Sequence, residues 1–261
     1  GKDILWSDHG LSWSAGEYGV NPVVPYVNAV FGLKLDGLSL PLVFLTNLLA
    51  VVAVLASWRI KQRIKEFHFW LLILISGVLG VFMSSDLLFF FLFWEVELLP
   101  MYLLISIWGS GNKDYSAMKF VLYNLLGSGF MLIGILSLRF AVGTFDIQEI
   151  ILVATSGRLE LGFLGAEVIY SMFLIGFLIK LPAWPFHTWL PDAHTDAPTP
   201  ISILLAGILL KMGGYGLIRM NFSIFPDVSD NWGPWLAVLA AFTVIYGAVL
   251  VFRQTDLKRV I

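Results

Sequence analysis

Four ionisable side chains lie inside long apolar runs of this sequence, and their chemistry would be the movement of protons. They are Glu95, Glu97, Lys180 and Lys211. A charge near the centre of a bilayer costs at least about 2.5–3.5 kcal/mol, so it requires a partner, a water-filled cavity or a function. A buried amine loses its proton readily, and a neighbouring carboxylate favours the protonated amine again. A carboxylate that moves relative to a lysine would therefore switch that lysine between holding and releasing a proton.

The depths of three of these side chains are compatible with one another. At a helical rise of roughly 1.5 Å per residue, Glu95 lies about 12 Å from one end of its run, and Lys180 and Lys211 lie about 20 Å into theirs. We therefore predict a proton relay of Glu95, Lys180 and Lys211, with a static ion pair between two helices as the alternative. Glu97 is about 200° around the helix from Glu95 and faces the other way, so we assign it no role in the relay.

The residues after Lys180 predict a broken helix. The run FLIKLPAWPFHTWLPDAH contains Pro182, Pro185 and Pro191, and prolines this dense cannot continue one regular helix. Tryptophan, phenylalanine and leucine persist between them, which is not typical of an aqueous loop. Broken helices with ions at the break mark transport sites in membrane proteins. The alternative is a helix that ends at Leu181 and is followed by a turn at the membrane interface.

Two histidines and two aspartates follow the break: His187, Asp192, His194 and Asp196. Their spacing in HTWLPDAH matches no regular metal-ligand pattern, and Pro191 interrupts it, so we predict no metal site. Histidine titrates near neutral pH and suits a proton path. We therefore predict that His187 is a relay member, with a structural histidine as the alternative.

The composition shows which elements must hold these groups. The 261 residues are 58% hydrophobic and only 13% charged, with a mean hydropathy of +0.85. Soluble domains carry about 25% charged residues, so this chain predicts a helical protein with several membrane spans. The net charge of −2 gives no basic surface for nucleic acid. The absence of cysteine excludes disulfides, thiolate zinc sites and cysteine-ligated iron–sulfur clusters.

The apolar runs are long enough for about seven transmembrane helices. We expect them at about 38–58, 68–83, 87–108, 118–142, 166–186, 198–218 and 233–252. The fold class is therefore all-α, with a membrane domain over 38–261, because solid apolar runs lack the alternating polarity of a transmembrane barrel. Residues 1–37 are expected to form an extended segment outside the membrane.

The basic residues between the runs indicate an orientation. One side of the predicted topology carries Arg59, Lys61, Arg63, Lys65, Lys113, Lys119, Arg253, Lys258 and Arg259. The other side carries Lys2, Lys34, Arg139, Arg158 and Arg219. We therefore place the first side in the cytoplasm, matrix or stroma.

Three stretches of the sequence also carry a resemblance to a known family. FLFWEVELLPMYLLISIWG, IKLPAWPFHTWLPDAHTDAPTP and LLAGILLKMGGYGLIRM resemble the antiporter-like, proton-pumping subunits of complex I. The match is to the subunit M, or chain 4, family of NADH–quinone oxidoreductase, including its cyanobacterial and chloroplast form. The order of spans fits this family from about residue 38 onward. Multi-subunit cation/proton antiporters and membrane-bound hydrogenases share the fold and the motifs.

The resemblance implies a fold, a set of site residues and an assembly. The fold would be two inverted five-helix repeats in a protein of about fourteen spans, of which this chain is a central fragment containing the first repeat. Glu95 matches the pairing glutamate, Lys180 the lysine before the helix break, Lys211 the central lysine, and His187 a suggested relay histidine. By this resemblance the second half-channel would lie outside this chain, so the fragment alone would hold only part of a proton path.

The implied function is proton translocation without redox chemistry in this chain. No cofactor would be bound here, while NADH or another donor and a quinone would be used by the assembly. The partners would be other membrane subunits of complex I, including neighbouring antiporter-like subunits, and the lipid bilayer. The membrane would be a bacterial plasma or thylakoid membrane or an organelle inner membrane. A cation antiporter or hydrogenase subunit, and an inert membrane subunit in which the charges only fix helices, are the alternatives.

Overall fold

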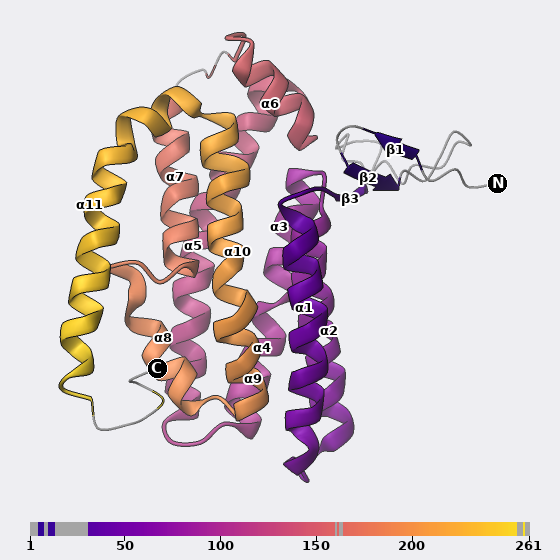
Figure 1. Cartoon of the computed structure of the whole chain (residues 1–261), viewed down its shortest axis with the longest axis vertical. Coiled ribbons are helices and arrows are strands. Elements are labelled where there is room, and N and C mark those ends of the chain that lie inside the picture. The colour runs from indigo at the N-terminus through magenta and orange to yellow at the C-terminus, as the bar shows by residue number, and fades with distance from the viewer. Residues whose placement is uncertain are drawn as a thin grey trace.

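The computed structural model describes residues 5–7, 10–13, 31–159, 161, 164–254 and 258, and long helices dominate it (Figure 1). The strands are β1 (Leu5–Ser7), β2 (Gly10–Trp13) and β3 (Leu33–Leu35), and the helices are α1 (Ser39–Ala56), η1 (Ser57–Arg59), α2 (Ile64–Met83), α3 (Leu87–Val96), α4 (Leu98–Trp108), α5 (Lys113–Val142), α6 (Ile147–Thr155), α7 (Gly165–Lys180), η2 (Phe186–Thr188), α8 (Trp189–Asp196), α9 (Thr199–Leu204), η3 (Leu205–Leu209), α10 (Leu210–Gly216), η4 (Leu217–Phe222) and α11 (Pro226–Val251). The three strands pair antiparallel in the order β1-β2-β3.

The predicted all-α membrane fold is confirmed. Within the described residues, six helical stretches are long and apolar enough to cross a bilayer: Ser39–Arg59, Ile64–Met83, Leu87–Trp108, Lys113–Val142, Thr199–Phe222 and Pro226–Val251. Each overlaps an expected span. The fourth and the last of these stretches begin five or more residues before the apolar runs at 118 and 233. Helices extend past the hydrocarbon where polar residues suit an N-terminus, as Pro226 and Asp227 do at the start of α11.

The expected span at 166–186 differs from the others because it is interrupted. α7 covers Gly165–Lys180 and has 16 residues, after which the chain turns through η2 into α8. The broken helix predicted from the prolines is therefore confirmed. Sequence analysis did not predict α6, a short helix between α5 and α7. Its first turn is capped by Asp146, whose side chain accepts a hydrogen bond of 2.8 Å from the backbone N–H of Glu149.

Small residues allow the two helices that frame the site to approach each other closely. α5 packs along α7, and a methyl group added at Gly176 would lie 2.9 Å from the carbonyl oxygen of Gly127. Such close crossings through small residues are typical of membrane helices. The crossing brings the C-terminal part of α7 against the middle of α5, where Phe120, Asn124 and Ser128 are buried.

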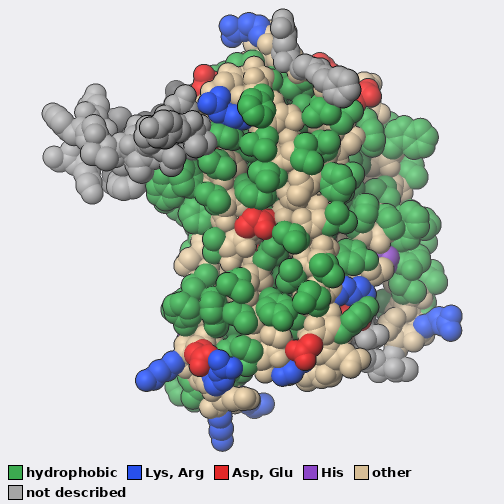
Figure 2. Space-filling view, turned by 180° about the vertical axis from the view of Figure 1, so that it is seen from behind, with side chains coloured by type: hydrophobic (Ala, Val, Ile, Leu, Met, Phe, Trp, Pro, Cys, Tyr) green, Lys and Arg blue, Asp and Glu red, His purple; other side chains and the backbone are tan. Residues whose placement is uncertain are grey.

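The outermost helices differ from the core helices in burial. α1 and α11 lie at opposite edges of the bundle, and only 17% and 0% of their most apolar windows are buried. Their exposed leucine, valine and phenylalanine side chains suit lipid or further protein. One end of the bundle contains the α1–α2 connection, the α4–α5 connection, and the helices α8 and α9. The opposite end contains α6 and β3 (Figure 1). Figure 2 shows Lys and Arg side chains gathered at this end below a broad hydrophobic face.

Candidate proton-transfer site

Lys180 is the last residue of α7, and the break after it exposes backbone groups that the rest of the fold satisfies. The N–H of Leu181 still donates to the carbonyl of Phe177 at 2.8 Å, and that of Ala183 to the carbonyl of Leu178 at 3.0 Å. The chain then returns through α8, where the buried indole of Trp189 donates to the carbonyl of Ile179 at 2.9 Å. Non-helical backbone at membrane depth requires such internal partners. The break thus places Lys180 inside the bundle.

The amine of Lys180 forms a buried ion pair with Glu97. The side chains of Lys180 and Glu97 are 1% and 0% exposed, so water does not reach the pair in this structure. The sequence interpretation gave the pairing position to Glu95 and no role to Glu97, whereas in the structure it is Glu97 that contacts the Lys180 amine. The carboxylate of Glu97 comes from the single residue between α3 and α4.

The interruption at Glu97 has a cause in the sequence. Pro100 has no N–H to donate to the carbonyl of Val96, so one backbone hydrogen bond is missing there. α3 is therefore assigned up to Val96 and α4 from Leu98, while Glu97 itself keeps helical backbone angles and the whole stretch Leu87–Trp108 remains one helical span. The carboxylate at this local weak point meets Lys180 at the end of α7.

Two aromatic rings complete the surroundings of the Lys180 amine. The nitrogen Nζ lies 5.4 Å from the ring centre of Trp94 and 5.6 Å from that of Phe120. Ammonium groups within about 6 Å of an aromatic face are attracted by the ring quadrupole. Both rings are buried. The positive charge is therefore held by one carboxylate and two ring faces.

Glu95 lies close to this pair without joining it. Its carboxylate is beside Ser128 of α5 and within electrostatic range of Lys180. Its oxygen Oε1 is buried and has no hydrogen-bond partner among the described residues. The residue as a whole is partly exposed, in contrast to Glu97. Figure 2 shows acidic atoms reaching the surface midway along the hydrophobic face of the molecule.

Lys211 is not brought into contact with Lys180. It lies on α10, is exposed, and donates a hydrogen bond of 2.7 Å to the carbonyl of Ala206. α10 does pack on the break: a methyl group at Gly213 would lie 2.8 Å from the carbonyl oxygen of Phe177 and 2.9 Å from the nitrogen of Leu181. Since Lys211 is about 200° around the helix from Gly213, it lies on the side of α10 away from α7.

His187 is also separate from the ion pair. Its ring packs edge-on against the ring of Tyr246 of α11, with 5.3 Å between the ring centres. Its Nδ1 is buried without a hydrogen-bond partner in the described chain. A polar cluster lies near His187, at the N-terminal end of α5. Lys119 forms an ion pair of 2.8 Å with Asp192, and the hydroxyls of Tyr123 and Thr188 are hydrogen-bonded at 2.7 Å. Sequence analysis did not find these contacts, because they join residues that are 65 and 73 positions apart in the chain.

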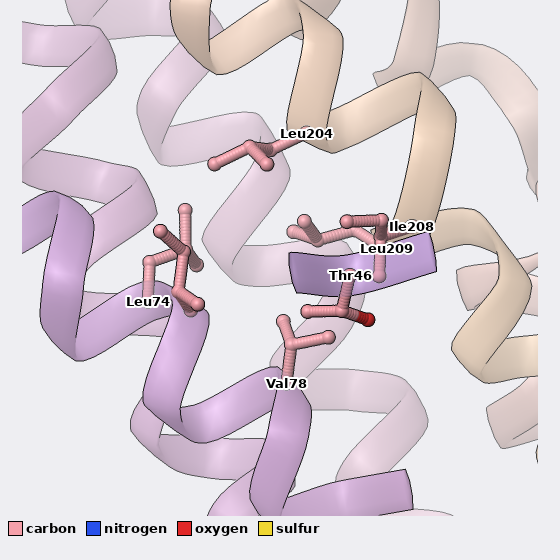
Figure 3. A pocket seen from close by; sticks show the side chains of 7 residues that line it. Thr46, Leu74, Val78, Leu204, Ile208 and Leu209 are labelled. Carbon is pink, nitrogen blue, oxygen red and sulfur yellow. The ribbon is translucent and has the colours of Figure 1, made fainter. Parts of the chain in front are cut away.

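In the described part of the chain, no three His, Asp or Glu side chains come together as metal ligands. A small hollow of about 10 Å³ lies between α1, α2 and η3 (Figure 3). Its walls are apolar apart from Thr46, whose hydroxyl donates to the carbonyl of Leu42 at 2.7 Å. This hollow has room for about one water molecule and is too small for a cofactor.

Comparisons with known proteins identify relatives of this arrangement. Residues 84–261 match the family model described as "NADH:quinone oxidoreductase/Mrp antiporter, TM". NAD(P)H-quinone oxidoreductase chain 4 from a Picosynechococcus species is 48% identical over 238 residues, which cover 90% of this chain and 43% of that protein. The chain therefore spans less than half the length of this relative.

Two solved structures share the fold. A chain of respiratory complex I from Thermus thermophilus with bound NADH has a TM-score of 0.78 and 28% identity, over 92% of this chain and 50% of that chain. A chain of the membrane-bound sulfane sulfur reductase, an archaeal respiratory membrane complex, has a TM-score of 0.79 over 97% of this chain and 40% of that chain. The second is 22% identical, so it supports the fold alone.

Proposed function

Because the chain belongs to the NADH:quinone oxidoreductase/Mrp antiporter membrane family, we propose that it is part of a proton-translocating subunit of an NAD(P)H:quinone oxidoreductase of the complex I type. The observation that carries the proposal is the buried ion pair between Lys180 and Glu97, located where α7 is interrupted. The chain would move protons, while electron transfer from the donor to quinone takes place in other subunits. The relatives named chain 4 support this assignment, and cyanobacteria among them favour a thylakoid or bacterial plasma membrane.

The burial of the ion pair supports a transport role over a purely structural one. Replacing a buried pair by apolar residues is often neutral or stabilising, so stability alone is a weak reason for keeping it. Ionisable groups inside membrane segments commonly mark proton pathways. Lys180 is also placed at a helix break, and broken helices with ionisable groups at the break mark transport sites.

In the proposed pathway each ionisable residue has its own task. Lys180 holds and releases the proton near the middle of the membrane, and Glu95 and Glu97 are its acidic neighbours. His187, next to Lys119 and Asp192, connects the site with the aqueous side at the basic end of the bundle. Lys211 receives the proton beyond the helix break. Since Lys180 and Lys211 do not touch, transfer between them would run through water.

A variant of Lys180 in the full-length protein tests the proposal. Lys180→Met, made in the intact complex, is expected to reduce donor-driven proton pumping in inverted vesicles to background, because methionine fills the same space and carries no proton. Lys61→Met is the matched control, since Lys61 is exposed between η1 and α2. Donor-to-quinone electron transfer measured with an uncoupler reports whether the complex has assembled. Normal pumping by an assembled Lys180→Met complex would contradict the proposal.

Co-purification of the chain with its partners distinguishes an assembly of the complex I type from a cation antiporter or a hydrogenase. Quinone-reducing partner chains would support the complex I type, whereas small antiporter subunits or hydrogenase subunits would assign the chain to another member of the family. An inert subunit is tested by the double variant Lys180→Met with Glu97→Leu, which removes both charges. Preserved pumping in that variant would support the inert role.

A further inference from the structure

The charges around Lys180 do not balance if all three groups are ionised. Lys180 and Glu97 form a neutral pair, and Glu95 lies within electrostatic range of the same amine. With both acids ionised the cluster would carry one uncompensated negative charge at membrane depth. Such a charge is costly in a low-dielectric interior, and a carboxyl group avoids it by taking up a proton. Charge balance therefore gives one proton to be shared by the two carboxyl groups.

The two carboxyl groups occupy different environments. Glu97 is fully buried and engaged with the amine, whereas Glu95 is partly exposed beside Ser128. The hydroxyl of Ser128 already donates to the carbonyl of Leu125 at 3.2 Å, so its lone pairs remain available to accept a hydrogen bond from the O–H of a neutral acid. In the arrangement seen here, the shared proton therefore belongs on Glu95.

Resting on the function proposed above, we propose that Glu95 and Glu97 alternate as the counter-ion of Lys180, so that movement of the lysine transfers a proton from one acid to the other. In the first state Lys180 is an ammonium paired with ionised Glu97, and Glu95 is a neutral acid. In the second state Lys180 is paired with ionised Glu95, and Glu97 is neutral. One O–H bond breaks at Glu95, one forms at Glu97, and the total charge of the cluster is unchanged.

The surrounding structure is suited to this exchange. The buried oxygen Oε1 of Glu95 has no hydrogen-bond partner in the described chain, so it is free of competing contacts. The rings of Trp94 and Phe120 support the positive charge without fixing its direction, since their attraction depends on a face and not on a single lone pair. Glu97 lies one turn before Pro100, where the helix lacks one backbone hydrogen bond. Sequence position alone would not separate the roles of these two acids.

Glutamine variants of the two acids test the exchange, in the full-length protein within its complex. Glu95→Gln replaces a neutral acid by a neutral amide, so we expect normal assembly, more than about tenfold slower pumping and loss of an infrared carbonyl band of a protonated carboxyl group. Glu97→Gln leaves the ammonium with Glu95 as its partner, so we expect a similar loss of pumping with the protonated-acid band also lost. Glu66→Gln is the matched control, because Glu66 forms an exposed ion pair with Arg63.

The outcomes distinguish this inference from the proposed function. If Glu95→Gln or Glu97→Gln pumps normally while Lys180→Met does not, the exchange is wrong and the proposed function stands. If Lys180→Met pumps normally, the proposed function itself is contradicted, and the exchange that rests on it falls with it. A protonated-acid band that persists unchanged in Glu95→Gln also overturns the exchange. Should Glu97→Gln fail to assemble, the pumping rate and the infrared band of Glu95→Gln decide the question.

Discussion

Two ion pairs within the helix bundle are built in opposite ways. Arg219 of η4 pairs with Asp36, which precedes α1, and their side chains are 15% and 17% exposed. Asp36 also accepts hydrogen bonds from the N–H groups of Leu38 at 3.1 Å and Ser39 at 2.9 Å. Arg219 donates to the hydroxyl of Tyr215 at 3.2 Å. This pair is anchored by several neighbours on both sides.

The pair of Lys180 and Glu97 has no comparable anchoring. It is more deeply buried, and its amine faces one carboxylate and two aromatic rings, with a second carboxylate nearby. Hydrogen bonds from several partners fix a charged group in one geometry, whereas ring faces do not. The comparison indicates that the outer pair fastens the fold and the inner pair can change partners.

The largest effect is expected from breaking the inner pair on one side only. Glu97→Leu should lower the free energy of unfolding by up to about 3–5 kcal/mol, because it removes the carboxylate that contacts the buried ammonium and leaves only the less buried Glu95 near it. Adding Lys180→Met should restore most of this loss, while pumping stays absent. Thermal unfolding of the purified full-length protein measures both variants. A double variant that is less stable than Glu97→Leu would show that the pair is needed for stability.

A smaller effect is expected from crowding the helix break without changing any charge. Gly213→Ala would place a methyl group 2.8–2.9 Å from backbone atoms of Phe177 and Leu181, so α10 must shift away from α7. Overpacking of this kind costs typically about 1–3 kcal/mol. Gly214→Ala is the matched control, since nothing lies within 4 Å of the added methyl group. Equal melting temperatures of the two variants would contradict the close packing.

A still smaller effect is expected from the outer pair. Asp36→Ala removes the partner of Arg219 and the hydrogen bonds to the start of α1. Loss of such a cap costs about 0.5–2 kcal/mol. Pumping should remain near the unsubstituted level, in contrast to every change at the inner pair. Pumping reduced as strongly as in Lys180→Met would remove the distinction between an anchoring pair and a working pair.

The smallest effect is a pH dependence of the outer pair. Burial raises the pKa of Asp36, but hydrogen bonds from Ser39 and the charge of Arg219 outweigh it and hold the pKa below the ordinary value of 3.8. A lowered pKa in the folded state means that the contribution to stability is complete above the ordinary value and is lost as the pH falls below it. Unfolding measured between neutral pH and about pH 3 should show this loss, and Asp36→Asn should reduce it. An identical acid dependence in Asp36→Asn would contradict the assignment.

The sequence predicted the parts of the fold that depend on local patterns. Apolar runs located the membrane helices, and Pro182 and Pro185 located the break after Lys180. The predicted site residue Lys180 is buried at a helix interruption, which is where an intramembrane charge was expected. These features follow from length, hydropathy and proline chemistry, all of which are visible within about twenty residues.

The choice between Glu95 and Glu97 could not be made in the same way. α3 is apolar on every side, so its sequence contains no polar stripe that shows which face points inward. In the structure the buried face contains Trp94 and Leu98. Measured around the helix axis, Glu97 is about 60° from Trp94, whereas Glu95 is about 100° from Trp94 in the opposite direction. The contact of Arg219 with Asp36 spans 183 positions and was equally invisible.

The two stretches that flank α10, η3 and η4, are π-helical. A π turn contains roughly one residue more than an α turn, and each residue of an α-helix accounts for about 100° of rotation. If η3 tightened to α geometry while the far end stayed fixed, Leu210–Gly216 would revolve about its own axis and η4 would absorb the twist. Lys211 would then sweep around the helix from one flank to another, with its height in the bilayer almost unchanged.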